Sequence, residues 1–499
     1  MNLLTRIEQL GNRLPDPASL FFIGTIVVMG LSQLAVILDW TVSSPATGVI
    51  HAQSLLTSDG LWWLFSHMVE NFIRFPPLAI VLVGMLGIGV AELSGLLPEL
   101  LRFLILRVPA ALLTPATVFT GIMSSLAMDA GYVVLPPVAA ALYLAAGRSP
   151  LTGIAAVFAG VSAGFSANLL ITALDPLLAG LTQTGANIID PEYQVAVTAN
   201  WWFMAASTVV LTLTGWAVTA WFVEPSLNRT NIDGGSASGS RTESSPEEIA
   251  GLRNAALTVI LLLIAVILCI IMPGAPLHGD GVRFPRWVEA TVPLLFLLFF
   301  LPGVVYGIQV RTIRTDQDVA RMLGETMARL GPYIVLAFFA AQFIESVNYS
   351  GLGKLLAMAG GQFLAVLQLS SSTLLTCFIL MVATINIVIA SASAKYAFLA
   401  PVFVPMLMQT GISPELTQAA YRIGDSVSNV ISPLNPYMII ILVLVQKYAR
   451  GSGLGTLIAM MLPYTLAFLA AWMLLLLAWI TLDIPLGPGG GLHYAAGLP

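Results

Sequence analysis

The sequence predicts an all-α protein that crosses a membrane many times. Of its 499 residues, 58% are hydrophobic and only 9% are charged, whereas about a quarter of the residues in a soluble domain are charged. Because the apolar runs are long and uninterrupted, they favour helices over the short alternating strands of a membrane barrel. Several reach the roughly 20 residues that a membrane-crossing helix needs, including 20–38, 200–223, 253–272 and 453–482.

A polar segment divides the chain into two membrane halves. Residues 226–252 are rich in Gly, Ser and charged side chains and cannot bury a core, so we interpret them as a cytoplasmic linker. The first half is then 1–225 and the second is 253–499. About nine spans are expected, at 20–38, 76–96, 151–182 and 200–223 before the linker and at 253–272, 291–308, 332–350, 415–447 and 453–483 after it.

A short phrase occurs once in each half. "DAGYVVLPP" at 129–137 and "SAKYAFLAP" at 393–401 both have Tyr three places and Pro eight places after their first residue. The same number of residues then leads to Pro150 and to Pro414, and "SANLLITALDP" further on parallels "VSNVISPLNP". The chain therefore contains a diverged internal repeat.

Each phrase lies between apolar segments that are short for a full span, in regions 113–147 and 372–411. A re-entrant hairpin is expected there, because non-helical backbone at membrane depth needs protein or a wet cavity around it. The next span of each half, 151–182 and 415–447, is interrupted by Asn or Asp with Pro. Paired hairpins and broken helices in two halves indicate the binding site of a transporter.

The distribution of Lys and Arg tests the topology. If the hairpins enter from opposite sides, Lys395 and Arg422 lie within the membrane, and only Arg74, Arg283, Arg286 and Lys354 fall on the less basic side. By the positive-inside rule, the crowded side is cytoplasmic. An inverted repeat in a bacterial-type inner membrane is therefore expected, with a cytoplasmic N-terminus and no removable signal peptide.

The phrases "SASAKYAFLAP", "RIGDSVSNVISPLNPY" and "AMDAGYVVLPP", together with "RLPDP" at 13–17, resemble the signatures of the AbgT (p-aminobenzoyl-glutamate transporter) family, which is related to sodium-coupled dicarboxylate transporters. The resemblance implies a homodimer of nine-helix, two-hairpin chains. It also implies uptake of p-aminobenzoyl-glutamate or export of sulfonamide-type antimetabolites. Six residues match positions that count as functional in the family: Asp175, Ser393, Pro414, Arg422, Asp425 and Pro433.

Ionisable residues within membrane spans are functional candidates by default. Arg422 and Asp425 are three residues apart and are expected on one helix face. Arg422 could bind a substrate carboxylate through its paired donors, or the two residues could simply neutralise each other. Asp175, just before Pro176, could cap a half-helix or couple transport to an ion. Tyr396 could stack on an aromatic substrate or be a core residue.

Neutral oxygens near the interruptions suggest an ion site. A dehydrated sodium ion needs such oxygens in place of water. The candidate ligands are Ser166 and Asn168 in the first half, Ser428, Asn429 and Asn435 in the second, and Asp129 at the first hairpin tip. Lys395, at the second tip, could bind an ion, form an ion pair or extend towards the interface. Coupling to sodium and coupling to protons both stay open.

Other classes of function have no support in the sequence. Cys269 and Cys377 lie in apolar stretches and are expected to be small hydrophobic side chains. The chain has no phosphate-binding GxxxxGK[ST] loop, no metal-ligand spacing among its histidines and no basic patch for nucleic acid. We therefore expect no enzyme and no cofactor other than a coupling ion. The main alternative to a secondary transporter is an ion or small-anion channel on the same hairpin scaffold.

Overall fold

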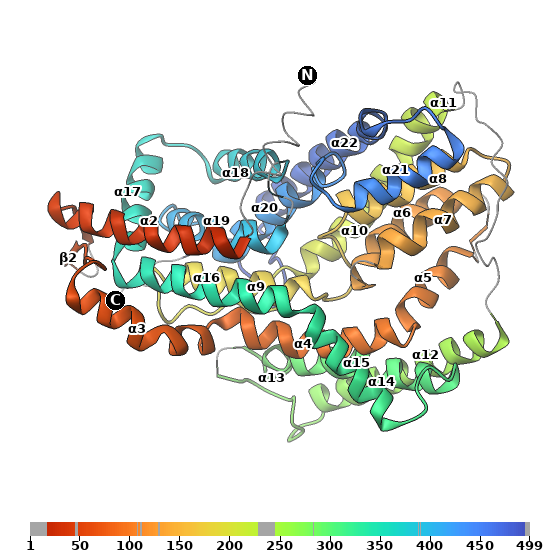
Figure 1. The fold of residues 1–499 in the computed structure, drawn as a ribbon, viewed down its shortest axis with the longest axis horizontal. Coiled ribbons are helices and arrows are strands. Elements are labelled where there is room, and N and C mark those ends of the chain that lie inside the picture. Colours follow the sequence, from red (N-terminus) through yellow and green to blue (C-terminus); the bar gives the residue numbers. More distant parts are fainter. Residues whose placement is uncertain are drawn as a thin grey trace.

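The computed structural model describes residues 17–44, 48–106, 108–109, 112–127, 130–227, 245–282, 284–387, 389 and 391–494. The described chain is mostly helical (Figure 1), which confirms the predicted fold class. The one sheet in these ranges is a ribbon of two antiparallel strands, β1 (Thr41–Ser44) and β2 (Gly48–His51), with Thr41 opposite His51. This ribbon connects two apolar helices and leaves the helical character of the fold unchanged.

Within the described ranges, six helical stretches are long and apolar enough to cross a membrane. A seventh is formed if α15 (Asp316–Arg329) and α16 (Gly331–Tyr349), which are bent by 45° at their junction, count as one span. The protein is therefore a multi-pass membrane protein, whereas the expected number of about nine spans stays a prediction. The six are α2 (Pro17–Ile37), α3 with α4 (Ser58–Ile73, Pro76–Leu93), α10 with its extension to residue 227 (Trp201–Val218), α12 (Pro246–Ile271), α14 (Thr291–Gln309) and α22 (Leu454–Thr481).

Shorter helices occupy the two repeat regions in the same order. In each region, a helix before the repeated phrase and a helix that carries most or all of the phrase are followed by a helix, a non-helical break and another helix. The breaks coincide with the interruptions seen in the sequence. The first set is α6 (Leu113–Met123), η2 (Ser124–Ala127), α7 (Ala130–Ala145), α8 (Pro150–Phe158), η3 (Ala159–Ala163) and α9 (Leu174–Ala186); the second is α18 (Ser371–Asn386), α19 (Ala392–Met408), α20 (Pro414–Val427) and α21 (Tyr437–Tyr448).

The two sets also pack in the same way. Helix α7 packs against α21, and α19 packs against α9, as Figure 1 shows on the right and left of the molecule. The repeated Tyr makes both contacts between halves: Tyr132 stacks on Tyr437 with centroids 4.0 Å apart, and the Tyr396 hydroxyl lies 2.8 Å from Thr182 Oγ1. The two halves thus repeat both the order of their helices and the contacts between them. The opposite orientation of the two copies in the membrane stays a prediction.

The remaining helices surround these sets. Helices α4, α12, α14 and α15 pack on one another along one side. The expected linker is too long at its C-terminal end, because residues 246–252 already form the start of α12. A capping box explains this start: Ser245 Oγ accepts from the Glu248 amide at 3.2 Å, and the Ser245 amide donates to Glu248. Six described helices lie beyond the expected spans and hairpin regions: α3, α5 (Leu96–Leu106), α11 (Glu224–Leu227), α13 (Arg286–Glu289), α15 and α17 (Leu352–Val366).

Candidate functional site

A cavity of about 250 Å³ lies where both repeat regions meet. Its walls come from η2, from the break before α9, from the first turn of α19, and from α4 and α16. Its polar lining residues are Ser125, Thr172, Tyr333 and Ser393, and the rest of the described lining is apolar, with no charged side chain. The cavity therefore suits an aromatic group with a few polar substituents.

An ion pair between the halves lies directly behind Thr172. Asp175, in the first turn of α9, accepts from Arg422 on α20 at 2.5 Å, and the two side chains are 10% and 1% exposed. The other carboxylate oxygen accepts from the Thr172 amide at 2.6 Å and from the Thr172 hydroxyl at 2.9 Å. Asp175 thus connects Arg422 to Thr172, which lines the cavity. The Nε of Arg422 has no partner in the described chain.

Arg422 and Asp425 do not neutralise each other, which was one of the two alternatives for this pair of residues. Asp425 pairs instead with Lys395 at the start of α19, with Nζ 2.7 Å from Oδ1 and both side chains 1% exposed. Every residue of α20 is buried, so Arg422 and Asp425 each find a partner on a helix that packs around α20. The spacing of three residues predicted that both lie on one helix face, and packing between helices gives each of them a partner on another helix.

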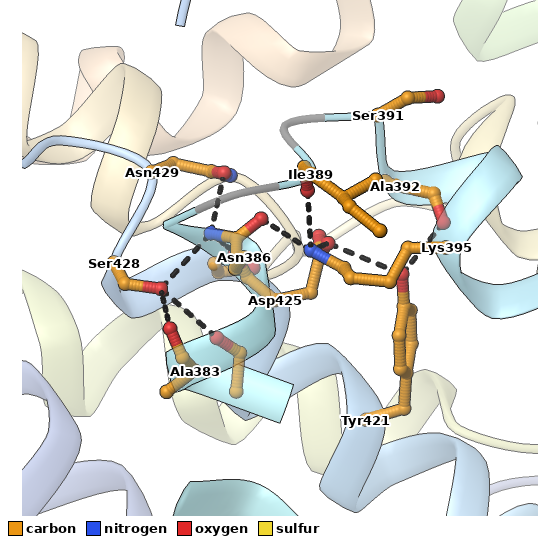
Figure 2. A network of polar contacts seen from close by, with 12 residues as sticks. Ala383, Asn386, Ile389, Ser391, Ala392, Lys395, Tyr421, Asp425, Ser428 and Asn429 are labelled. Carbon is orange, nitrogen blue, oxygen red and sulfur yellow. Dashed lines mark hydrogen bonds and ion pairs between the residues drawn. The ribbon is translucent and has the colours of Figure 1, made fainter. Parts of the chain in front are cut away.

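The Lys395 pair belongs to a polar network (Figure 2). Lys395 also donates to Asn386 Oδ1, at the end of α18. The Asn386 amide group donates to Ser428 Oγ and to Asn429 Oδ1, both at 2.9 Å. The Tyr421 hydroxyl lies 2.6 Å from the Ala392 carbonyl oxygen. Three helices of the second half therefore converge on one buried ammonium group.

The candidate sodium ligands fall into two separate clusters. In the first half, Asn168 in the break before α9 donates to Ser125 Oγ in η2 at 2.6 Å. In the second half, Ser428 and Asn429 contact Asn386, and Asn435 donates to Ser162 Oγ at 3.2 Å. In both halves a hairpin tip thus contacts the Asn of the broken helix.

Two further sodium candidates are placed differently. The Ser166 amide donates to Ser426 Oγ at 3.2 Å, and its own hydroxyl has no partner in the described residues. Asp129 lies outside the described part of the chain. No group of three or more His, Cys, Asp or Glu side chains in the described ranges is arranged to hold a metal.

The other candidates divide between cavity, core and backbone roles. Ser393 lines the cavity. Tyr396 is fully buried against Tyr421, with centroids 4.1 Å apart, and does not line the cavity. Pro414 is the first residue of α20, where its missing amide leaves no helical bond unmade. Pro433 lies in the break between α20 and α21.

Sequence reasoning missed three residues that the structure places at the cavity or the ion pairs, and one buried carboxylate on α20. Tyr333 lines the cavity, and its hydroxyl is buried without a partner in the described chain. Thr172 orients Asp175, and Asn386 contacts Lys395. Glu415 is 1% exposed and accepts from the Tyr193 hydroxyl at 2.8 Å. Glu415 could have been found, because it is a carboxylate next to Pro414; the other three are ordinary polar residues in apolar segments.

Comparison with known proteins decides the family. The model of the AbgT transporter family, ABG_transport, matches residues 2–494. The chain belongs to the AbgT family. The resemblance inferred from the signature phrases is thereby confirmed, and this AbgT member is a transport protein, not an enzyme.

Several relatives of this AbgT member are similar along almost their whole length. The p-aminobenzoyl-glutamate transport protein of Escherichia coli is 36% identical over 488 residues, which are 97% of this chain and 95% of the relative. The structure of the YdaH transporter of Alcanivorax borkumensis has a TM-score of 0.91 at 43% identity, covering 95% of this chain and 100% of that one. MtrF of Neisseria gonorrhoeae, described as illuminating a class of antimetabolite efflux pumps, has a TM-score of 0.92 at 43% identity, covering 98% and 100%.

Proposed function

We propose that this transporter carries p-aminobenzoyl-glutamate or a related small aromatic carboxylate, and that it also exports sulfonamide-type antimetabolites. The observation that carries the proposal is the apolar cavity of about 250 Å³ between the two repeat regions, with four hydroxyl groups in its lining. An apolar wall can cover an aromatic ring, while hydroxyl groups can bind an amine, amide or sulfonyl group. The names of the relatives point to the same compounds.

The charge of an anionic substrate requires a cation near the cavity. Arg422 is connected to the cavity lining through Asp175 and Thr172, and its Nε has no partner in the described chain. A guanidinium group can bind two carboxylate oxygens side by side. In this proposal a substrate carboxylate competes with Asp175 for Arg422, so substrate binding and the ion pair between the halves are linked.

Transport by alternating access distinguishes this function from a channel. In vesicles that contain the purified protein, labelled p-aminobenzoyl-glutamate should enter with saturable kinetics, and unlabelled substrate on the opposite side should accelerate its exchange. A sulfonamide should compete for the same site. Proton and sodium gradients imposed separately would show which ion is coupled. Unsaturable flux without any response to either gradient would favour the channel.

The proposed setting is a homodimer in a bacterial-type inner membrane, with the N-terminus on the cytoplasmic side. Apolar side chains of α12, such as Leu257 and Leu261, are more than half exposed and need lipid or a second copy of the chain to cover them. Light scattering of the detergent-solubilised protein should give the mass of two chains after the detergent contribution is subtracted. A single-chain mass would contradict the dimer.

Removing the Tyr333 hydroxyl should weaken substrate binding without weakening the fold. This hydroxyl has no partner in the described chain, so Tyr333→Phe loses no internal hydrogen bond, whereas a bond to substrate is worth about 0.5–1.5 kcal/mol. We expect KM to rise about 2- to 10-fold with an unchanged melting temperature. The matched control is Tyr464→Phe, since that hydroxyl bonds to Thr219; it should lower the melting temperature and leave KM alone. An unchanged KM for Tyr333→Phe would remove this residue from the site.

A further inference from the structure

The second hairpin carries a lysine where the first carries a glycine. In the aligned phrases, the residue before the repeated Tyr is Gly131 in the first half and Lys395 in the second. The first position cannot hold a side chain without rearrangement, because a Cβ on Gly131 would lie 2.2 Å from Ser124 Oγ. The two hairpin tips are therefore similar in packing but different in charge.

The surroundings of Lys395 are those of a bound cation. Its Nζ lies 2.7 Å from Asp425 Oδ1, donates to Asn386 Oδ1 and is 3.4 Å from the Ile389 carbonyl oxygen. The ring of Tyr421 adds a cation–π contact, with its centroid at 5.9 Å. Carboxylate, amide and backbone carbonyl oxygens are also the ligands that proteins offer to hard metal cations. Figure 2 shows these oxygens around the ammonium group.

We propose that the second hairpin junction is a cation site filled by the tethered ammonium of Lys395, and that this half exchanges a proton instead of binding a metal ion. The transport part of this inference rests on the proposed function, whereas the cation site itself does not. In the exchange, the Nζ–H bond breaks, the electron pair stays on nitrogen and the proton passes to water. The pair with Asp425 then changes from net zero to one negative charge.

The groups that face Lys395 explain why this proton matters. Among the described residues, Asp425 and Tyr421 are the titratable groups in contact with it, both from α20. Helix α18 contributes only the neutral Asn386. Asp175 on α9 is paired with Arg422, and the chargeable groups of α16 and α17, Glu345 and Lys354, make no ion pair or hydrogen bond with Lys395. Asp425 is thus its sole counter-charge in the described chain.

Loss of the proton would release the hairpin tip. Asp425 Oδ2 already lacks a partner in the described residues, so a neutral lysine leaves a buried carboxylate without compensation, which is costly. The contact between α19 and α20 would weaken as a result. Because Ala392 and Ser393 at the same tip line the cavity, the proton and the substrate would act on one movable element.

A test of the cation site needs no substrate. Lys395→Ala should leave a vacant site, so sodium chloride should raise the melting temperature of the purified variant by about 2 °C or more over choline chloride at equal ionic strength. This sodium effect should be clearly smaller in the parent protein and in the control Lys354→Ala. An equal response of Lys395→Ala and the parent protein would overturn the proposal. If Lys395→Ala does not fold, Lys395→Met, which keeps a longer side chain, should be stabilised by sodium instead. The double variant Lys395→Met with Asp425→Asn should not be stabilised. No stabilisation of Lys395→Met, or equal stabilisation of the double variant, would also overturn the proposal.

A second test measures the proton in vesicles. The measured quantity is a ratio: accumulation of p-aminobenzoyl-glutamate with an imposed pH gradient, divided by accumulation without one. This ratio should exceed one for the parent protein and for Lys354→Arg. For Lys395→Arg, whose guanidinium keeps its proton, the ratio should fall to about one. A ratio equal to that of the parent, or loss of all transport in Lys395→Arg, would count against the lysine as the proton carrier. Failure of the parent protein to transport this substrate would instead contradict the proposed substrate, and the sodium test would still decide the cation site.

Discussion

Replacing Asp175 by Ala should destabilise the protein by about 3–5 kcal/mol, because removing one partner of a buried ion pair leaves the other charge uncompensated. Arg422 is 1% exposed and has its ion pair with Asp175 alone in the described chain. Thr172 would lose its acceptor as well. The free energy of unfolding, measured by denaturing-detergent titration of the solubilised protein, should show the loss.

The reciprocal change should give the same loss of stability and a distinct effect on transport. Arg422→Ala should weaken binding of anionic p-aminobenzoyl-glutamate more than binding of an uncharged analogue. The matched double variant, Asp175→Asn with Arg422→Gln, has no buried charge to compensate and should recover most of the stability without recovering affinity for the anion. Equal losses of affinity for both ligands would mean that Arg422 is structural only.

Placing a methyl group on Gly160 should cost about 1–3 kcal/mol through overpacking and should reduce transport. A Cβ there would lie 2.4 Å from the Val118 carbonyl oxygen and 3.0 Å from the Gly121 Cα. These are backbone atoms of α6, so the first hairpin and the first broken helix would have to separate. Loss of unfolding free energy and of vesicle uptake in Gly160→Ala should therefore appear together.

Gly30 provides the control for this substitution. A Cβ on Gly30 in α2 meets no atom within 4 Å, so Gly30→Ala should be neutral or should stabilise the helix by up to about 1 kcal/mol. If Gly160→Ala behaves like Gly30→Ala, the close approach of α6 and η3 is not needed for stability.

The repeat shows how far sequence reasoning reaches into the fold. Proline and polar residues within apolar runs predicted the breaks near Asn168 and Asn429, because they remove or compete with backbone hydrogen bonds whatever the tertiary context. The aligned phrases put Tyr132 and Tyr396 at the same position of the repeat. Both rings lie at contacts between the halves.

The ion pairs show where such reasoning ends. Helical periodicity correctly puts Arg422 and Asp425 on one buried helix, but a periodicity does not say which other helix faces them. The partner of Arg422, Asp175 on α9, is 247 residues away. The partner of Asp425 is Lys395, on α19. The roles of Asn386, Thr172 and Tyr333 were equally out of reach, since polar residues of these types are common in membrane helices.

The sequence alone determined that the chain is a helical membrane protein with a duplicated, interrupted core, because hydropathy, proline positions and repeated phrases act locally along the chain. Only the tertiary structure decided that Arg422 pairs with Asp175, that Lys395 pairs with Asp425, and that the described part of the cavity wall has no charged side chain. Charge pairing at membrane depth depends on distances of a few ångströms between helices that are far apart in the chain. Those distances are set by packing, which no local pattern encodes.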